Sequence, residues 1–399
     1  MQKYPPFRNR SRVRLLAIGM SLALLAVACG GDDEEDAGPP PDALDAPSDD
    51  ADEPDADEPD ADEEEGLVFN NQEIASAELL AAAQEEGQLI FYTSHFEEGE
   101  IALAEEFTND TGVEVEVVRL PGTRLDERIL TEAGAGELTM DVVHQSDPTN
   151  NLEYFEEGLI QPYEVTESIR EQIPDEWVHP DNLYYSTFIS TMGIAYNNQL
   201  VSEEDAPAGF MDLLDPQWEG QIIQPFAGIG GSGWSMALFQ RQVLGEDYWA
   251  DLAAQNPTIG QSSAGIAEEV ARGEFPVTIN AITTTMGAVR DGAPITVVFP
   301  EEGTPTFPYA LSLAADGPNP NAGQLYMNWR NSLRGLSFGV ETVGTYVGHP
   351  DAPAPMGADD ERLPSFEEIQ PWAPDADDWV NLREEWVAEW NEAYNFSPE

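Results

Sequence analysis

The chain of 399 residues contains one cysteine, Cys29, and one lysine, Lys3. With a single thiol, no disulfide can form within the chain. Long apolar runs are also lacking, because the stretch 15–28 falls short of the ~20 residues that a membrane-spanning helix needs. Residues 1–28 carry five basic side chains and no acidic one. This pattern predicts an export signal peptide over residues 1–28 rather than a transmembrane helix.

Cys29 directly follows the apolar run and precedes an acidic spacer. This placement resembles the lipid-attachment site of bacterial lipoproteins, and the resemblance implies a lipoprotein signal peptide over 1–28 and a lipid on Cys29. The alternative is an ordinary secretory signal followed by an incidental cysteine. We expect the protein at the cell surface, lipid-anchored on the extracellular face of the cytoplasmic membrane, or in the periplasm.

Basic residues are scarce along the whole chain. After residue 66 there are 58 acidic residues and 11 arginines, a net charge near −47 with histidine neutral. Nucleic acids and anionic membranes need clustered Lys and Arg, so neither is expected as a partner, and the lipid anchor is the only expected membrane contact. Such a surface is typical of salt-loving bacteria, because a Debye length of roughly 3 Å at 1 M salt weakens the self-repulsion. Attraction of a cationic ligand is the alternative.

Residues 30–66 form an acidic spacer in which Asp-Ala-Asp-Glu-Pro occurs at 50–54 and again at 55–59. Its hydrophobicity is too low to offset the entropy of ordering, so we predict that 29–66 is a lipidated cysteine followed by a disordered tether. At ~3.3 Å per residue its maximal reach is on the order of 120 Å. Calcium capture by its carboxylates is the alternative, although it has no glycine-centred loop of the EF-hand type.

From Leu67 onward the composition is globular, and about 330 residues exceed one comfortable core, so we expect two lobes. Helix and strand patterns alternate, which predicts an α/β fold with a mostly parallel sheet flanked by helices in each lobe. The expected boundaries are 67–189 for the first part of lobe 1, 190–294 for lobe 2, and 295–399 for the hinge return, the second part of lobe 1 and the C-terminal helices.

The expected elements follow from apolar periodicity and from glycine positions. The helices are expected over 74–86, 100–109 and 124–133, from Trp234 onward, and in a segment ending at Gly273. The strands are expected over 88–92, 113–117, 140–143, 193–196, 221–224, 276–280 and 295–300. A loop is expected over 228–233. Trp379, Leu382, Trp386 and Trp390 are spaced by three and four residues, which predicts a buried helix face.

Several short segments between residues 75 and 370 occur in a fairly specific order and spacing. They are Ala83–Gly87, Ile90–Ser94, Phe107–Val113, Glu132–Gly136, Asp141–Val143, Ile194–Asn197, Asp212–Gly220 and Phe299–Gly303. Together they resemble the extracellular solute-binding proteins of ABC importers, particularly the branch of iron(III)-binding proteins. The resemblance implies a type II periplasmic-binding-protein fold with crossing strands between the lobes and a ligand cleft between them. It also implies a monomer without a cofactor that delivers a small molecule or ion to a membrane permease.

Iron sites of this branch use a His after the first strand, a Glu after the third, and two adjacent Tyr in the second lobe. His95 falls in the matching loop, Ser146 lies near the Glu position, and Thr283 and Thr284 take the tyrosine positions. A threonine cannot supply the phenolate that a ferric ion prefers. His95 is therefore the one metal-ligand candidate that matches the family, and we predict no metal site.

The loops beyond the carboxyl ends of the strands are where ligands bind in such sheets, and here they are rich in neutral polar groups. The residues expected to bind the ligand are Thr93, Ser94, His95, Arg124, Ser146, Gly231, Ser232, Ser262, Ser263, Thr283 and Thr284. Several begin helices, where free N–H groups favour an anion. Arg124 is the expected partner of a carboxylate or phosphonate, and a solvated arginine is the alternative.

We therefore predict that the ligand is a small anionic or zwitterionic organic solute, whereas the family implies iron(III) or an iron chelate. His95 either lines the cleft or merely ends a strand. The loop 228–233 either wraps an oxyanion or forms a flexible turn capped by Ser232.

We expect a binding protein and not an enzyme. A hydrolase is the enzyme alternative, but residues 230–234 lack the final glycine of a nucleophile elbow, and His349 has no marked acid partner. A ligand-sensing or structural surface lipoprotein of the same fold is the remaining alternative.

Overall fold

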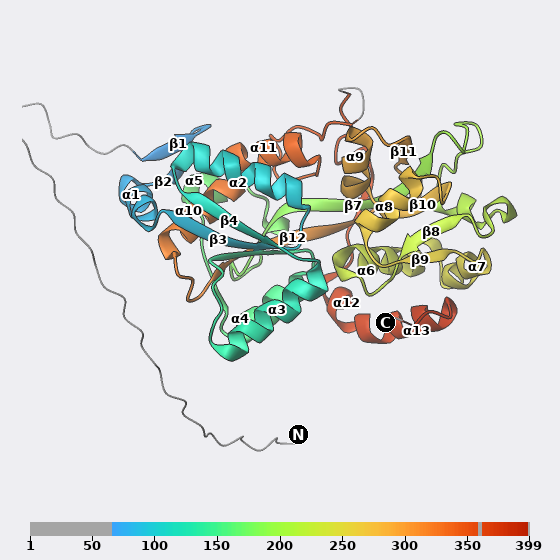
Figure 1. The fold of residues 1–399 in the computed structure, drawn as a ribbon, viewed down its shortest axis with the longest axis horizontal. Helices are drawn as coiled ribbons and strands as arrows, with labels where there is room; N and C mark the ends of the chain where they lie inside the picture. Colours follow the sequence, from blue (N-terminus) through green and yellow to red (C-terminus); the bar gives the residue numbers. More distant parts are fainter. Residues whose placement is uncertain (1–65, 358–360, 398–399) are drawn as a thin grey trace, which may run out of the picture. The chain divides into compact units, whose positions relative to one another are not determined.

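The computed structural model describes residues 66–357 and 361–397 (Figure 1). The predicted signal peptide, Cys29 and all of the predicted tether before Gly66 lie outside these residues. Within the described part of the chain, no helix combines the length and the apolar character that crossing a membrane requires.

The first block of elements runs from residue 67 to residue 197. Its strands are β1 (Leu67–Phe69), β2 (Gln72–Ala75), β3 (Gln88–Thr93), β4 (Glu114–Arg119), β5 (Val142–Gln145), β6 (Ile160–Gln161) and β7 (Tyr185–Asn197). Its helices are α1 (Ala77–Glu86), α2 (Glu97–Thr111), α3 (Gly122–Ala135), α4 (Pro148–Glu156), α5 (Glu167–Arg170) and η1 (Asp175–Trp177).

The second block contains the remaining elements. Its strands are β8 (Ile222–Pro225), β9 (Thr258–Gly260), β10 (Val277–Ala281), β11 (Ile295–Val298), β12 (Thr304–Ala314) and β13 (Pro371–Trp372). Its helices are η2 (Phe210–Leu214), η3 (Pro216–Trp218), α6 (Gly230–Phe239), η4 (Gln240–Leu244), α7 (Tyr248–Ala254), α8 (Ser263–Ala271), α9 (Ile282–Arg290), α10 (Pro320–Asn331), α11 (Leu333–Val343), α12 (Ala376–Asn381) and α13 (Arg383–Ala393).

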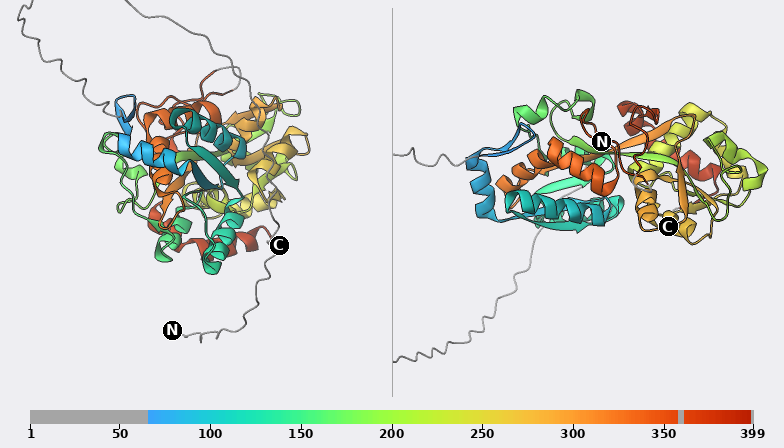
Figure 2. Two further views of the ribbon diagram at one scale, coloured as in Figure 1. Left: turned by 60° about the vertical axis from the view of Figure 1, so that its left-hand side comes forward. Right: turned by 90° about the horizontal axis from the view of Figure 1, so that it is seen from above.

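Two long strands, β7 and β12, join two parallel sheets. In one lobe the order is β4-β3-β5, all parallel, and in the other β10-β8-β9, also parallel. Strand β7 pairs with β12 through residues 185–191, and with β10 and β11 through residues 192–197. The right-hand view of Figure 2 shows the two sets of elements on either side of these strands. The predicted α/β architecture of two lobes with crossing strands is confirmed.

Each parallel sheet is covered on both faces, as alternating side chains in its strands show. In β3, Phe91 belongs to the core beneath α1, α2, α10 and α11, whereas Tyr92 belongs to the core beneath α3 and α4. In β8, Ile222 packs in the largest core of the second lobe, and Ile223 packs under α8 and α9. Trp379 and Trp390 of the predicted aromatic stripe are buried in that second-lobe core.

Some predicted boundaries were wrong. The first helix starts at Ala77 and not at residue 74, because Ile74 and Ala75 belong to β2. Helix α3 continues through Gly134, where a glycine costs only about 1 kcal/mol relative to alanine. Helix α6 starts at Gly230, four residues earlier than Trp234.

Close packing explains the early start of α6. A Cβ on Gly231 would lie 2.1 Å from the carbonyl oxygen of Ser146, and one on Gly233 would lie 2.0 Å from that of Phe226. The glycines there allow the helix to touch neighbouring backbone, so the expectation of a flexible loop over all of 228–233 was wrong.

Candidate functional site

A pocket of about 430 Å³ lies beyond the carboxyl ends of the parallel strands of both lobes and against the crossing strands. Eight of the predicted site residues line it: Ser94, His95, Ser146, Ser232, Ser262, Ser263, Thr283 and Thr284. The residues that line it without having been predicted are Phe96, Arg119, Pro121, Gly122, Thr123, Ser190, Phe226, Gly228, Ile229, Gly230, Gln261, Ala264, Ala281, Phe307 and Tyr309. We call this cavity the ligand pocket.

Three predicted residues do not line the ligand pocket. Thr93 directly precedes the lining residue Ser94 and is fully buried. Its Oγ1 accepts the N–H of His95 at 3.0 Å. Arg124 is exposed on α3. Gly231 instead packs its backbone against Ser146.

Arg119, and not the predicted Arg124, is the arginine that lines the ligand pocket. It is the last residue of β4, and its Nε donates to the carbonyl oxygen of His95 at 3.0 Å. Among the described residues it has no carboxylate partner. The signal in the sequence that could have identified Arg119 was its position at the carboxyl end of a parallel strand. The valines of that strand made this position hard to recognise.

Carboxylates are absent from the lining of the ligand pocket. Of the residues that the structure describes, no Asp or Glu lines the pocket, although 58 acidic residues follow residue 66. The described lining contains an arginine and no carboxylate, so the pocket is positive within a strongly acidic chain. Such a pocket suits an anion.

Three helices begin at the pocket without a side-chain cap. They are α3, α6 and α9, and the residues before them are Pro121, Ile229 and Ala281. The first N–H groups of a helix lack intrahelical partners, and the helix dipole makes this end positive. By contrast, α8 is capped by Ser262, whose Oγ accepts the N–H of Gly265 at 3.1 Å. The uncapped ends can donate hydrogen bonds to a ligand oxyanion.

Hydroxyl groups complete the polar lining. The Ser94 Oγ is engaged, since it accepts the N–H of Ser146 at 3.2 Å. Within the described residues, the hydroxyls of Ser263, Thr283 and Thr284 make no hydrogen bond. They are available to a ligand as donors or acceptors.

His95 forms part of the pocket wall and is 3% exposed. Its Nδ1 lies 3.1 Å from Glu100 Oε1, but the two atoms are not aligned for a hydrogen bond. Its ring packs edge-on against Tyr309, with ring centroids 4.4 Å apart. Behind it, Glu100 is fully buried and lies 2.5 Å from a guanidinium nitrogen of Arg330. We call Glu100, Arg330 and His144 the buried ion network.

The buried ion network is structural and fixes the wall behind His95. The His144 Nδ1 lies 3.1 Å from Glu100 Oε1, and its Nε2 lies 2.9 Å from the hydroxyl of Thr187. Burial lowers the pKa of His144 to about 4, despite the opposing effect of Glu100. Burial opposes the charge on Glu100, but Arg330 and the histidines hold its pKa well below the ordinary value. His144 is fully buried and is not among the residues that line the pocket.

The described lining is poor in the groups that a ferric ion prefers. Burial raises the pKa of Tyr309, which keeps this tyrosine a neutral phenol. Among residues 66–357 and 361–397, no group of three or more His, Cys, Asp or Glu side chains is placed to hold a metal. The expectation of no metal site stays a prediction, with His95 as the family-matching residue.

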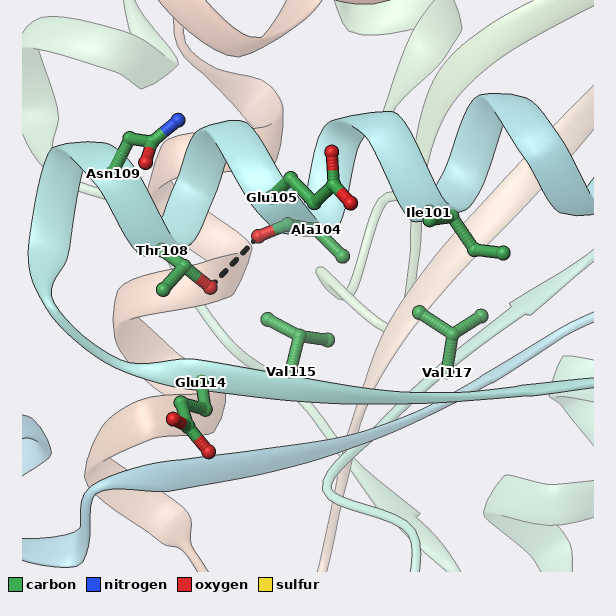
Figure 3. A pocket seen from close by; sticks show the side chains of 8 residues that line it. All are labelled: Ile101, Ala104, Glu105, Thr108, Asn109, Glu114, Val115 and Val117. Carbon is green, nitrogen blue, oxygen red and sulfur yellow. Dashed lines mark hydrogen bonds between the residues drawn. The ribbon is translucent and has the colours of Figure 1, made fainter.

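A larger hollow of about 600 Å³ lies between α2 and the edge strand β4 (Figure 3). Val115 and Val117 point toward the helix, and Glu114 points to the other side of the strand. The Oγ1 of Thr108 donates to the carbonyl oxygen of Ala104 at 2.9 Å within the helix. This hollow involves one helix and one strand and has no cationic group, so it is a weaker candidate site than the ligand pocket.

Residues 140–329 match the family described as bacterial extracellular solute-binding protein. Iron uptake protein A1 of Synechocystis sp. is 27% identical over 139 residues, 35% of this chain and 38% of that protein. The probable ABC transporter periplasmic-binding protein y4fP of Sinorhizobium fredii is 20% identical over 283 residues, 67% of this chain and 78% of that protein. The match thus spans little more than a third of iron uptake protein A1.

Solved structures share the fold. The periplasmic binding protein AfuA from Actinobacillus pleuropneumoniae, with fructose-6-phosphate bound, superposes with a TM-score of 0.65 and 20% identity over 78% of this chain and 99% of that one. Iron-bound HitA from Pseudomonas aeruginosa gives 0.58 and 18% identity over 77% and 97%. These likenesses confirm the type II fold of periplasmic binding proteins.

Proposed function

We propose that this chain, a bacterial extracellular solute-binding protein with the type II fold, is the substrate-binding component of an ABC import system. It captures a small anionic organic solute in the ligand pocket and delivers it to a membrane permease. We also propose that it acts as a monomer, without catalysis, and is attached to the extracellular face of the membrane through a lipid on Cys29.

The charge of the ligand pocket supports this proposal most strongly. Its lining contains Arg119 and no carboxylate, within a domain that carries a net charge near −47. A cationic solute such as a polyamine would meet an arginine and positive helix ends, which repel it. A phosphate, phosphonate or carboxylate would receive charge-assisted hydrogen bonds from the same groups.

Bare iron(III) fits the pocket less well. The positions that hold tyrosines in the iron-binding branch are Thr283 and Thr284, and the hydroxyl of Tyr309 stays neutral because burial raises its pKa. The pocket also offers no carboxylate. Fructose-6-phosphate bound to AfuA supports an organic anion as a ligand of this fold. A chelate of iron with an organic acid is itself anionic and belongs among the ligands to test.

The test is calorimetric titration with fructose 6-phosphate, citrate, ferric citrate, inorganic phosphate, spermidine and ferric nitrilotriacetate at one ionic strength. We expect at least one organic anion to bind, and Arg119→Gln to weaken it roughly tenfold or more, because charged hydrogen bonds contribute about 1.5–3 kcal/mol. Arg124→Gln is the matched control and should leave affinity unchanged, since Arg124 lies outside the lining. Binding of spermidine or of ferric ion alone would contradict the proposal.

A further inference from the structure

A second pocket of about 450 Å³ adjoins the ligand pocket. The two share Gly122, Thr123, Ser146 and Gly230 in their linings. A ligand that reaches past these residues would therefore contact both cavities. We call this cavity the adjoining pocket.

The adjoining pocket has the opposite charge to the ligand pocket. Asp126, Glu127 and Asp147 line it together with one cation, Arg383. Arg383 is engaged, since it forms an ion pair with Asp147. Within the described part of the chain, Asp126 and Glu127 have no cationic partner. Burial raises the pKa of Asp126, as expected of a carboxylate that lacks a counter-ion.

A residue with an orphaned acceptor also lines the adjoining pocket. Gln145 is fully buried, and its Nε2 donates to the hydroxyl of Tyr154 at 3.0 Å. That hydroxyl donates in turn to Asp126 Oδ1 at 2.9 Å. Because its proton is used in this bond, the hydroxyl must accept from Gln145, which places the amide nitrogen and not the amide oxygen next to Tyr154. Among the residues that the structure describes, none donates a hydrogen bond to the Gln145 Oε1. A buried carbonyl oxygen without a donor is costly unless a ligand supplies one.

We propose that the adjoining pocket is a second subsite that binds a protonated amine of the same ligand whose anionic group occupies the ligand pocket. The substrate class is then a small zwitterion, an amine joined by a short chain to a phosphate, phosphonate or carboxylate. An ammonium group carries only donors, and the adjoining pocket offers the Gln145 oxygen and the carboxylates of Asp126 and Glu127 as acceptors. The inference rests on the proposed function, because it needs an anion in the ligand pocket.

The test compares two probes that differ only in the amine, phosphoethanolamine and ethyl phosphate, by calorimetric titration of the full chain. The amine should tighten binding about tenfold, the order expected of a charge-assisted hydrogen bond in a partly enclosed site. Glu127→Gln should reduce that preference at least threefold, because it removes one of the carboxylates proposed to accept the amine. Because Glu127 is exposed, this variant should fold normally. Asp126→Asn is a second variant and should act in the same direction.

Glu137→Gln is the matched control. Glu137 is an exposed acidic residue just after α3 and outside both pockets. Its substitution therefore removes the same charge as Glu127→Gln, but away from the proposed subsite. It should leave the preference for the amine intact. Equal affinity for the two probes, or an equal effect of Glu127→Gln and Glu137→Gln, would overturn the second subsite. A preference for fructose 6-phosphate that Glu127→Gln does not change would also overturn it, in favour of a polyol subsite.

The two proposals fail in different ways. If neither phosphoethanolamine nor ethyl phosphate binds and no other anion does, the anionic ligand of the proposed function is wrong. If ethyl phosphate binds and the amine adds nothing, the ligand pocket stands and the second subsite alone is wrong.

Discussion

The two lobes contribute different chemistry to the ligand pocket. The first lobe contributes Arg119 and His95, and behind His95 lies the buried ion network of Glu100, Arg330 and His144. The second lobe contributes hydroxyls and the backbone N–H groups that begin α6 and α9. Both lobes contribute hydroxyls and uncapped helix starts, but among the described residues only the first contributes an arginine to the lining. We expect substitutions in the buried ion network of the first lobe to lower the free energy of unfolding. We expect substitutions at the pocket in the second lobe to lower the ligand affinity.

The largest effect is expected at the buried ion network. Glu100→Gln leaves Arg330 buried without its carboxylate, and both side chains are nearly inaccessible, at 0% and 1% exposure. Breaking a buried pair by removing one partner costs about 3–5 kcal/mol. We expect urea unfolding to show a loss of that order.

The exposed pair of Arg272 and Glu268 is the control for this loss. Arg272→Gln should leave the unfolding midpoint unchanged, because solvent screens this pair. If the two variants unfold at the same urea concentration, the buried network does not support the first lobe.

The stability of the first lobe should also fall in mild acid. Burial lowers the pKa of His144 from 6.5 to about 4, so the folded state resists a proton that the unfolded state accepts. A group with a lowered folded pKa stabilises the protein above its unfolded pKa, and this contribution is lost as the pH falls from 6.5 toward 4. The loss is on the order of 3 kcal/mol, at 1.36 kcal/mol per pKa unit.

The measurement is the free energy of unfolding at several pH values for the wild type and for His144→Gln. The variant should show a shallower slope between pH 6.5 and pH 4. Parallel curves would mean that the carboxylates of this acidic chain, and not His144, determine the dependence.

Gly231→Ala should mainly affect binding through the second lobe. Its Cβ would lie 2.1 Å from the Ser146 carbonyl oxygen, so the start of α6 must move away from Ser146, which also lines the pocket. Overpacking of this kind costs about 1–3 kcal/mol, and we expect ligand affinity to fall roughly tenfold. In contrast, Gly134→Ala meets no atom within 4 Å and should stabilise α3 by roughly 0.5–1 kcal/mol. Unchanged affinity in Gly231→Ala would mean that α6 does not contact the ligand.

The smallest effect is expected where the C-terminal helices join the lobes. Asp147 caps α4 in the first lobe, accepts the indole N–H of Trp379 at 2.9 Å, and pairs with Arg383 of α13. Trp379 belongs to the second-lobe core. Arg383→Gln should speed the dissociation of ethyl phosphate, which has no amine to reach the adjoining pocket, about threefold, the size of a partly exposed ion pair. Arg241→Gln is the control, since Arg241 pairs with Glu389 of the same helix without reaching the first lobe. Equal dissociation rates in the two variants would rule out this link.

Local patterns in the sequence were enough to predict the α/β fold and most of the pocket loops. Glycines at 87 and 112 ended helices as expected, each in the left-handed region, with φ of 75° and 77°. The long strand β7 was predicted only over 193–196. Its earlier half lacks an apolar period of two because it contains the pairs Ser186-Thr187 and Ser190-Thr191, yet all of it is buried. Pairing with β12, which is distant in sequence, decides that half.

The site was predictable in kind but not in every residue. Hydroxyls in loops beyond the strands could be recognised, because strand order determines where such loops gather. The choice between Arg119 and Arg124 could not, since it depends on which residue ends β4 and which way α3 turns. Likewise, the role of Gly231 depends on contact with Ser146, which lies 85 residues earlier.

Native mass spectrometry with metal analysis, on protein purified without refolding, tests most directly whether the ligand is an organic anion. We expect the pocket to retain, or to take up from a metabolite extract, a small organic anion at one molecule per chain. A protein that carries a stoichiometric ferric ion without an organic ligand, or that binds polyamines alone, would contradict it.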